Sequence, residues 1–389
     1  MGKKDNLRKN IYYIGFYSFS GGTLEKENRV YSSAAVNLMN FISQKLSSNA
    51  TVNIISPSWT NNQRGIYRGK KVQLSDNVFL NIAPSVGTYF GLGKFLSIII
   101  SQIWLIFKII FTIKERDKVI VYHSVAFAPV ILITKKLFSY KLILQLNEVY
   151  QDVKSQGLIK NYFEKAIIRD AGAYIVSNHF LKERMKSYNK EVIICEGVLR
   201  MNRPFLEKFS DGKIHLIYAG LIDKIKNCSF NAIAIAPFLS EKYVIHIAGF
   251  GSELDVADLL AKIKELNIYS KCQIVFEGFL EGSNLFQFLQ KCHIGLVAQS
   301  PDQKFTYSSF PSKIYTYLTN NLIVLSLSNS LILSSPVSNL IFTYEKNDPS
   351  QIAEVIANID YKKNHSGEYT NILDSIEVNF NNELLLLVA

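Results

Sequence analysis

Short runs of apolar and β-branched residues alternate with helix-length segments along nearly the whole chain. This alternation is typical of parallel sheets covered by helices on both faces, because strands buried on both sides read as continuous apolar runs. Seven strands are predicted in the first half, at residues 11–16, 52–55, 78–82, 119–122, 141–146, 173–176 and 192–195. Five more are predicted at residues 214–218, 244–247, 273–276, 294–297 and 323–326. The chain is therefore predicted to be an α/β protein.

A polar stretch with a proline, from Gly197 to Lys213, separates the two series of strands and is predicted to be a linker. A length of 389 residues is also right for two domains. We expect one doubly wound domain at residues 1–204 and a second at 205–364, with residues 365–389 free to pack back on the first. Because such sheets bind ligands beyond the carboxyl ends of their strands, the active site is expected in the cleft between the domains.

The net charge of +11 is divided unevenly along the sequence. Residues 1–200 carry 28 Lys and Arg against 13 Asp and Glu, whereas residues 201–389 carry 15 against 19. The first half is thus expected to face an anionic partner, either a membrane surface, a phosphorylated substrate or nucleic acid. Nucleic acid is the poorest of these, because the cations are scattered without a motif that reads RNA or DNA.

The N-terminal residues contain no signal peptide, so the cytoplasm is the expected compartment. The segment from Lys94 to Lys114 is apolar and as long as a membrane span. It is open to three interpretations: a span, a peripheral helix facing the membrane, or a buried helix. Lys108 inside the segment and the charged turn after it argue against a span, and the flanking cations favour an anionic interface.

Glycine-rich turns follow several predicted strands. Gly21 and Gly22 follow the first strand and precede a helix, where backbone amides can approach a phosphate or the glycines can simply make a turn. In the second half, Gly220 is followed by Lys226 at the start of a predicted helix, and Gly249 and Gly251 form another predicted turn. The next strand ends at Glu277 and Gly278, and a later segment, FPSKIYTYLTNNLIVLS, begins a helix at Pro311.

These features, in this order, resemble the nucleotide-sugar-binding domain of GT-B glycosyltransferases, particularly the capsule and exopolysaccharide members of glycosyltransferase family 4. That family has a helix of the form PSKxxEYLxxGxPVV, to which FPSKIYTYLTNNLIVLS is similar. The segments AYIVSNHFLKERM, CEGVLRMN and SNLIFTYEKNDPSQIAEVIANI also resemble family segments. The resemblance covers about residues 11–360 and implies two Rossmann-like domains.

The resemblance implies a bacterial enzyme that moves a sugar from a nucleotide diphosphate, UDP being favoured, to a glycan or lipid-linked acceptor in surface polysaccharide synthesis. It implies retention of configuration and no metal or other cofactor, and no Asp-x-Asp triplet is present. Lys226 would stabilise the leaving diphosphate. The donor-binding residues carried over from the family are Gly21, Gly22, Gly220, Lys226, Gly249, Gly251, Glu277, Gly278, Ser309, Pro311, Ser312, Lys313 and Thr316.

The sequence departs from the family in two respects. An expected arginine is replaced by Leu221 and Ile222, so that Lys224 or Lys313 would have to take its place. The family's two glutamates are replaced by Ser308 and Thr316, whose hydroxyl groups accept hydrogen bonds more weakly than a carboxylate. Two hypotheses follow: a divergent active enzyme, or a degenerate partner subunit that binds a sugar or protein and supports an active transferase.

On the acceptor side, His123 follows a predicted strand where the family often has a histidine near the transferred sugar. A histidine satisfied at the end of a strand is the alternative. Glu148 follows the next strand and would position an acceptor hydroxyl or, in an inverting enzyme, act as general base. His123, Glu148 and Lys226 are thus the predicted catalytic residues.

Overall fold

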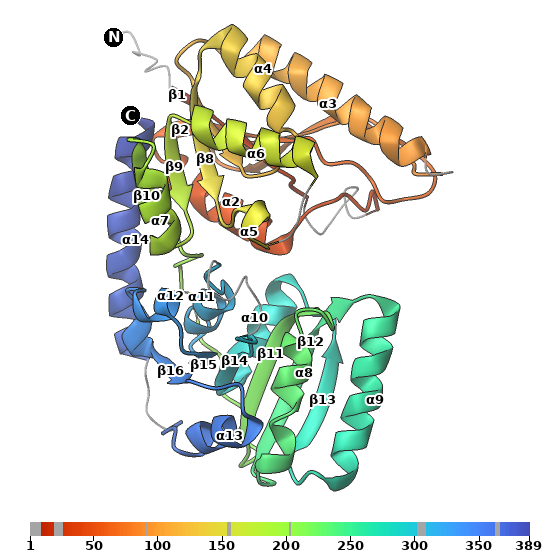
Figure 1. Cartoon of the computed structure of the whole chain (residues 1–389), viewed down its shortest axis with the longest axis vertical. Coiled ribbons are helices and arrows are strands. Elements are labelled where there is room, and N and C mark those ends of the chain that lie inside the picture. The colour runs from red at the N-terminus through yellow and green to blue at the C-terminus, as the bar shows by residue number, and fades with distance from the viewer. Residues whose placement is uncertain are drawn as a thin grey trace. The chain divides into compact units, whose positions relative to one another are not determined.

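The computed structural model describes residues 9–18, 26–89, 92–153, 157–201, 204–301, 309–361 and 366–389. The chain divides into two compact units. The N-terminal unit comprises Met1–Ser177, Leu181–Cys195 and the last nine residues, Asn381–Ala389, and the C-terminal unit comprises Asn178–Phe180 and Glu196–Phe380. Figure 1 traces the chain through both units.

The N-terminal unit is built on an eight-stranded sheet with the order β10-β9-β8-β7-β1-β2-β5-β4. The strands are β1 (Lys9–Ile14), β2 (Ala50–Ser56), β4 (Lys70–Ser75), β5 (Val78–Ile82), β7 (Lys118–Tyr122), β8 (Lys141–Leu146), β9 (Ala173–Val176) and β10 (Glu191–Ile194). All neighbours are parallel except β4, which pairs antiparallel with β5 at one edge. A small antiparallel ladder joins β3 (Ile66–Tyr67) to β6 (Ser85–Val86).

The helices of this unit are α2 (Ser33–Leu46), α3 (Leu92–Thr112), α4 (Ala128–Phe138), α5 (Tyr150–Val153), α6 (Leu158–Asp170) and α7 (His179–Lys186).

The C-terminal unit has six parallel strands in the order β13-β12-β11-β14-β15-β16. They are β11 (Ile214–Ile222), β12 (Tyr243–Gly251), β13 (Gln273–Gly278), β14 (Ile294–Val297), β15 (Ile323–Leu327) and β16 (Ile341–Tyr344). Every one of the twelve predicted strands is therefore present, and these twelve pair parallel with one another as expected.

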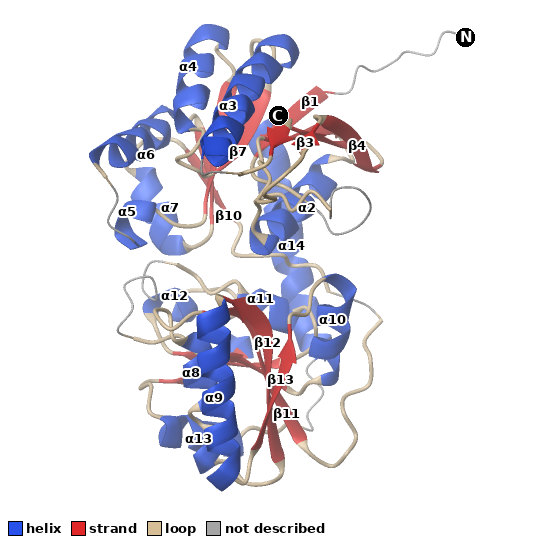
Figure 2. Ribbon diagram, turned by 90° about the vertical axis from the view of Figure 1, so that its right-hand side faces the viewer, coloured by secondary structure: helices blue, strands red, loops and turns tan. Residues whose placement is uncertain are grey.

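Helices cover the second sheet on both sides, and Figure 2 shows α9 and α10 on opposite faces of it. The helices of this unit are α8 (Cys228–Ile233), η1 (Ala236–Phe238), α9 (Glu253–Tyr269), α10 (Gly282–Lys291), α11 (Lys313–Leu318), α12 (Ser330–Leu333), η3 (Ser338–Leu340) and α13 (Pro349–Ala357). The last helix, α14 (Ser366–Val388), belongs to this unit as far as Phe380 and to the N-terminal unit beyond it. Because both faces are covered, β11 begins with five consecutive buried residues.

The helix ends follow from local sequence. The Ser252 hydroxyl accepts a hydrogen bond from the Asp255 amide at the start of α9, where acidic residues also favour the positive end of the helix dipole. The Asp348 carboxylate caps α13 in the same way, and Pro349 occupies the first helical position. The C-terminal end of α14 is held in the N-terminal unit, because Lys141 Nζ donates to Leu387 O at 2.9 Å.

The α3 helix has one buried edge and one exposed apolar stripe. Its buried edge recurs every four residues, with Leu105 and Ile109 in the core of the N-terminal unit. The stripe on its exposed side, which we call the α3 stripe, consists of Phe95, Ile99, Ile103, Phe107 and Phe111. An 18-residue stretch within Gly93–Thr112 is strongly apolar, and 22% of it is buried. By length and composition α3 could cross a membrane, but its buried edge makes it part of this unit's core.

Candidate functional site

Three neighbouring strands of the C-terminal unit bring glycines together at their carboxyl ends. Gly220 of β11 lies beside Gly249 of β12, and Ala248 pairs with Gly278 of β13. A Cβ atom at Gly249 would lie 1.9 Å from Gly220 O, and one at Gly251 would lie 2.2 Å from Ile222 O. The residues are thus glycine because two backbones approach closely.

This arrangement corrects one prediction. Gly249 and Gly251 do not form a turn before a helix, because β12 continues in the extended conformation to Gly251 and pairs with β11 as far as Ile222. The strand-ending role belongs to Gly278, whose φ of +73° is in the left-handed region. The longer strands could not be predicted from the sequence, because glycine normally weakens or ends a strand.

Lys313 reaches across the end of β11. A Cβ atom at Gly220 would lie 2.6 Å from Lys313 Cε and 2.7 Å from its Nζ. The ammonium group also lies over the ring of Tyr218, 4.9 Å from its centroid. Burial lowers the pKa of Lys313, and the nearby charge of Lys226 lowers it further. Lys313 thus brings a cation to the end of β11, within the electrostatic reach of Lys226, and this arrangement suits a diphosphate.

Lys226 lies two residues before α8, not within it, and the left-handed Asn227 precedes the first helical residue. The carboxylate of Asp223 accepts hydrogen bonds from the amides of Ile225 at 2.6 Å and Lys226 at 3.2 Å. These two amides are therefore occupied, and the Lys226 contribution to anion binding must come from its side chain.

Of the two lysines proposed to replace the missing arginine, only Lys313 is placed to do so. Lys224 forms an ion pair with Asp258, and about half of each side chain is exposed. The pair lies in an open groove between α8 and α9, together with Asn227 and Lys262.

The segment that resembles the family helix forms α11, and it begins later than predicted. Its first helical residue is Lys313 after Ser312, so Pro311 is not the first residue of the helix. Ser312 is exposed, while Ser309 and Thr316 are half-buried. Thr316 Oγ1 donates to Ser312 O at 3.3 Å, a local bond. Ser308, Gly21 and Gly22 lie outside the described residues.

Two tyrosines fix the position of α11, and neither is among the site residues predicted from the sequence. Tyr317 lies so close to β14 that a Cβ atom at Gly295 would be 2.4 Å from its ring, and its hydroxyl accepts from Ala219 N at 3.0 Å. Tyr315 Oη donates to the buried carboxylate of Glu196 at 2.5 Å, and Ser335 Oγ donates at 2.7 Å. Burial raises the pKa of Glu196. Lys313 is therefore carried on a helix whose position is well defined.

Glu277 is half-buried near the end of β13, and its Oε1 accepts a hydrogen bond from His246 Nδ1 at 2.7 Å. Gly278 follows it at the strand end. A histidine partner for Glu277 was not anticipated, since His246 is thirty-one residues away in sequence.

In the N-terminal unit, His123 follows β7 as predicted and is buried. Its Nε2 lies 2.9 Å from Glu164 Oε1 of α6, and its ring stacks on Tyr150 with centroids 4.9 Å apart. The Glu164 carboxylate also accepts from the amides of Tyr150 and Gln151. Although burial opposes it, the hydrogen bonds from His123, Gln151 and Tyr150 lower the pKa of Glu164. Nδ1 of His123 is buried with no partner among the described residues.

Glu148 is half-buried two residues after β8, near two tyrosines. Burial raises the pKa of Tyr150 to about 12, and the charge of Glu148 adds to that effect. The pKa of Tyr122 is raised in the same way. Glu148 and His123 are thus associated through Tyr150, whose hydroxyl donates to His123 O at 3.1 Å.

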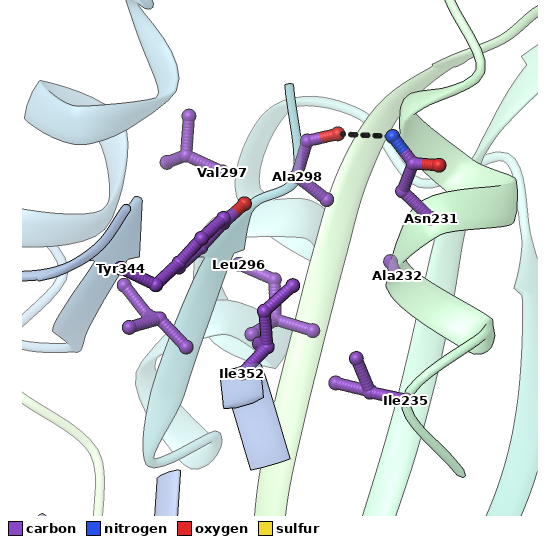
Figure 3. A pocket seen from close by; sticks show the side chains of 9 residues that line it. Asn231, Ala232, Ile235, Leu296, Val297, Ala298, Tyr344 and Ile352 are labelled. Carbon is purple, nitrogen blue, oxygen red and sulfur yellow. Dashed lines mark hydrogen bonds between the residues drawn. The ribbon is translucent and has the colours of Figure 1, made fainter. Parts of the chain in front are cut away.

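A small pocket in the C-terminal unit is lined by core residues (Figure 3). Its polar contact is Asn231 Nδ2, which donates to Ala298 O at 3.4 Å, and the other labelled side chains include Leu296, Tyr344 and Ile352. The lining has no charged residue. Such a pocket is a packing gap and does not suit a phosphorylated ligand. Among the residues described, no group of three His, Cys, Asp or Glu could hold a metal ion.

No protein-family model matches the sequence, and no curated protein matches it. Solved structures are similar in fold. One is trehalose-6-phosphate from E. coli bound with UDP-2-fluoro glucose, 10% identical, with a TM-score of 0.66 over 98% of both chains. Sucrose-phosphate synthase from Thermosynechococcus elongatus is 11% identical, with a TM-score of 0.64 over 98% of this chain and 95% of the other. HepE of Anabaena in complex with UDP is 10% identical, with a TM-score of 0.61 over 98% of this chain and 99% of the other.

The chain has the GT-B fold. The match extends over both units of the chain and confirms the predicted architecture. The resemblance to family 4 is not tested by these similarities, which are to synthases of phosphorylated disaccharides and to HepE.

Proposed function

We propose that the protein is a glycosyltransferase that moves a sugar from a nucleotide diphosphate, UDP being favoured, to a glycan acceptor. The observation that carries the proposal is the position of Lys313 against Gly220 at the glycine-lined end of β11, where the charge of Lys226 also acts on it. Structures of the same fold in complex with UDP and with a UDP-sugar support this choice of donor.

In the proposed reaction the bond between the sugar and the diphosphate breaks, and negative charge develops on the leaving phosphate. Lys226 and Lys313 would stabilise that charge, so the reaction would need no metal ion. Glu277 and Gly278 would face the base, and Ser309, Ser312 and Thr316 would lie near the ribose and diphosphate. Retention of configuration, as in the family that the sequence resembles, would leave no role for a protein nucleophile.

The N-terminal unit would hold the acceptor, with His123 and Glu148 near the reacting hydroxyl. Because Glu164 occupies Nε2 of His123, the ring would contact substrate through Nδ1 or not at all. Glu148, close to Tyr122 and Tyr150, would position an acceptor hydroxyl.

We further propose that the acceptor is lipid-linked and belongs to a bacterial surface polysaccharide, such as a capsule. The protein would be peripheral on the cytoplasmic face of the cell membrane. The α3 stripe supports this, because it exposes large apolar side chains beside the cations Lys94 and Lys108, a combination that suits an anionic lipid surface. The neighbouring α4 also exposes Ile133 and Leu137.

The experiment that tests the proposal is a screen of UDP, GDP and their sugars by thermal shift, followed by measurement of nucleotide release. Stabilisation by one nucleotide, with release of that nucleotide from its sugar in the presence of acceptor, is expected. Binding without release of the nucleotide from any nucleotide sugar would instead support the degenerate partner subunit. The hydroxyl of Thr316, in place of the family's glutamate, would then explain the lack of turnover. If neither nucleotide and none of their sugars binds, the proposed donor site is contradicted.

A further inference from the structure

Four titratable side chains form an unbroken line of hydrogen bonds in the C-terminal unit. Asp211 Oδ1 lies 3.0 Å from His215 Nε2, His215 Nδ1 lies 2.8 Å from His246 Nε2, and His246 Nδ1 lies 2.7 Å from Glu277 Oε1. The line crosses β11, β12 and β13 on one face of the sheet, because His246 pairs in register with Ile217 and Val275. We call these four residues the histidine relay.

The number of protons in the relay follows from its geometry. Both carboxylates accept hydrogen bonds, so His215 Nε2 and His246 Nδ1 must each carry a proton. The hydrogen bond between His215 Nδ1 and His246 Nε2 needs one further proton, on either of these two nitrogens. The two rings thus hold three protons when all three bonds are made, one more than two neutral imidazoles. With only two protons on the two rings, one of the three hydrogen bonds must be lost. With four protons, His215 Nδ1 and His246 Nε2 would both carry a hydrogen, and the bond between them could not form.

The linker closes over the relay. The ring of Phe209 lies 4.2 Å from that of His215. Phe209 N donates to Lys291 O at 2.9 Å, and Lys208 Nζ donates to the carbonyls of Cys292 and Asn321 at 2.7 Å. Both relay histidines are therefore buried, whereas about half of the Asp211 side chain is exposed.

The relay has other titratable neighbours on the elements packed against it. These are Lys208, Lys213, Cys292 and His293. Burial lowers the pKa of His293 to about 4, so this ring is neutral and its Nδ1 accepts from His215 N at 3.1 Å. Burial lowers the pKa of Lys208 to about 8, and burial raises the pKa of Cys292. Burial lowers the pKa of His246, and the positive charge of Lys208 also opposes an extra proton, whereas the two carboxylates of the relay favour it.

We infer that His215 and His246 take up one proton as a pair and thereby fix Glu277 beside Gly278, which makes them positioning residues for the donor nucleotide. When the pair loses that proton, the bond to Asp211 is the one that breaks, because Asp211 can turn into water and Glu277 is less exposed. The His215 ring then loses its anchor on Asp211, so that His246, and through it Glu277, is held less firmly, while the linker stays bonded through the Phe209 amide and the Lys208 ammonium group. The link to the nucleotide rests on the proposed function, but the shared proton does not.

The shared proton is tested by following the ring nitrogens of the six histidines by NMR over a pH titration. His215 and His246 should change together in one step, because interacting sites titrate as a pair. The variant Asp211→Asn keeps a hydrogen-bond acceptor but removes a charge, and should lower the midpoint of that step by about 1 pH unit. The exposed His179 is the internal control. Independent titration of the two rings, or an unmoved midpoint, would overturn the shared proton.

The positioning role is tested by the affinity for UDP on either side of that midpoint. Because the phosphate of UDP itself titrates near pH 6, wild type and Asp211→Asn are compared at the same pH. Between their two midpoints, where only wild type holds the proton, wild type should bind UDP about fivefold more tightly. Equal affinity there would overturn the positioning role. If UDP binds to neither protein at any pH, the proposed function fails while the NMR result stands by itself.

Discussion

The side chain of Lys313 lies directly against the backbone of Gly220, so that a single methyl group at position 220 would come within 2.6 Å of Lys313 Cε. The glycine therefore makes the space in which the ammonium group reaches the end of β11. These residues are ninety-three positions apart, and each belongs to a segment that resembles the donor domain of a glycosyltransferase.

The first prediction concerns this space. Gly220→Ala should displace Lys313 from the end of β11 and weaken UDP binding about tenfold or more, the cost of losing a hydrogen bond to a charged group. Isothermal titration calorimetry measures the change. Gly157→Ala is the matched control, because a Cβ atom there meets nothing within 4 Å. Unaltered affinity in Gly220→Ala would remove Lys313 from the site.

A second prediction concerns the buried ion pair of the N-terminal unit. The Arg29 guanidinium donates to the Glu27 carboxylate at 2.7 and 2.9 Å, and to Ser58 O and Ala83 O. Arg29→Met should cost about 3 kcal/mol of stability, because it leaves the buried Glu27 carboxylate with Lys70 as its remaining cation and leaves two buried carbonyls without their donor. Denaturant unfolding measures the loss. Arg169→Met, at a largely exposed arginine that pairs with Asp170, should cost less than about 1 kcal/mol. Equal losses in the two variants would contradict the prediction.

Glu196 predicts a dependence of stability on pH. Because burial raises its pKa, the folded protein holds this proton more tightly than the unfolded chain does. Its contribution is therefore fully present below the ordinary glutamate pKa of about 4.3 and is lost as pH rises through the raised value. Glu196→Gln should remove that part of the decline, as measured by unfolding between pH 4 and 8. Parallel curves for the two proteins would show that Glu196 does not titrate in this way.

The α3 stripe predicts membrane binding. Wild-type protein should float with vesicles that contain anionic lipid, and Phe107→Glu with Phe111→Glu should reduce that binding more than tenfold, because two large apolar side chains are lost from the contact. Leu254→Glu, at an exposed leucine of α9 in the other unit, is the control and should float like wild type. If the double variant floats as well as wild type, the stripe is not the contact.

The fold could be predicted from the sequence because its signals are local. The apolar run from Ile294 to Val297 matches β14 at both ends, since a short buried strand is recognised by its residues alone. The antiparallel β4 (Lys70–Ser75) was missed, because its side chains alternate between exposed and half-buried and its sequence is polar. The length of β12 was underestimated because glycines at 249 and 251 resemble a turn until the neighbouring backbone is known.

The candidate site was predicted less completely, since it depends on contacts between distant residues. Gly220 and Lys313 were both named from the family resemblance, but only the structure places one against the other. The choice between Lys224 and Lys313 likewise required the ion pair with Asp258. Glu164 could not have been found from sequence, because nothing near it indicates a partner forty-one residues away.

The central claim is that Lys226 and Lys313 form a diphosphate site in the C-terminal unit. Calorimetric titration of UDP into wild type, Lys313→Ala, Lys226→Ala and Lys224→Ala tests it most directly. We predict one binding site in wild type, affinity at least about tenfold weaker in Lys313→Ala and lost in Lys226→Ala, and unchanged affinity in Lys224→Ala, whose ammonium group is paired with Asp258. No binding to wild type, or equal affinity in all four proteins, would contradict the claim.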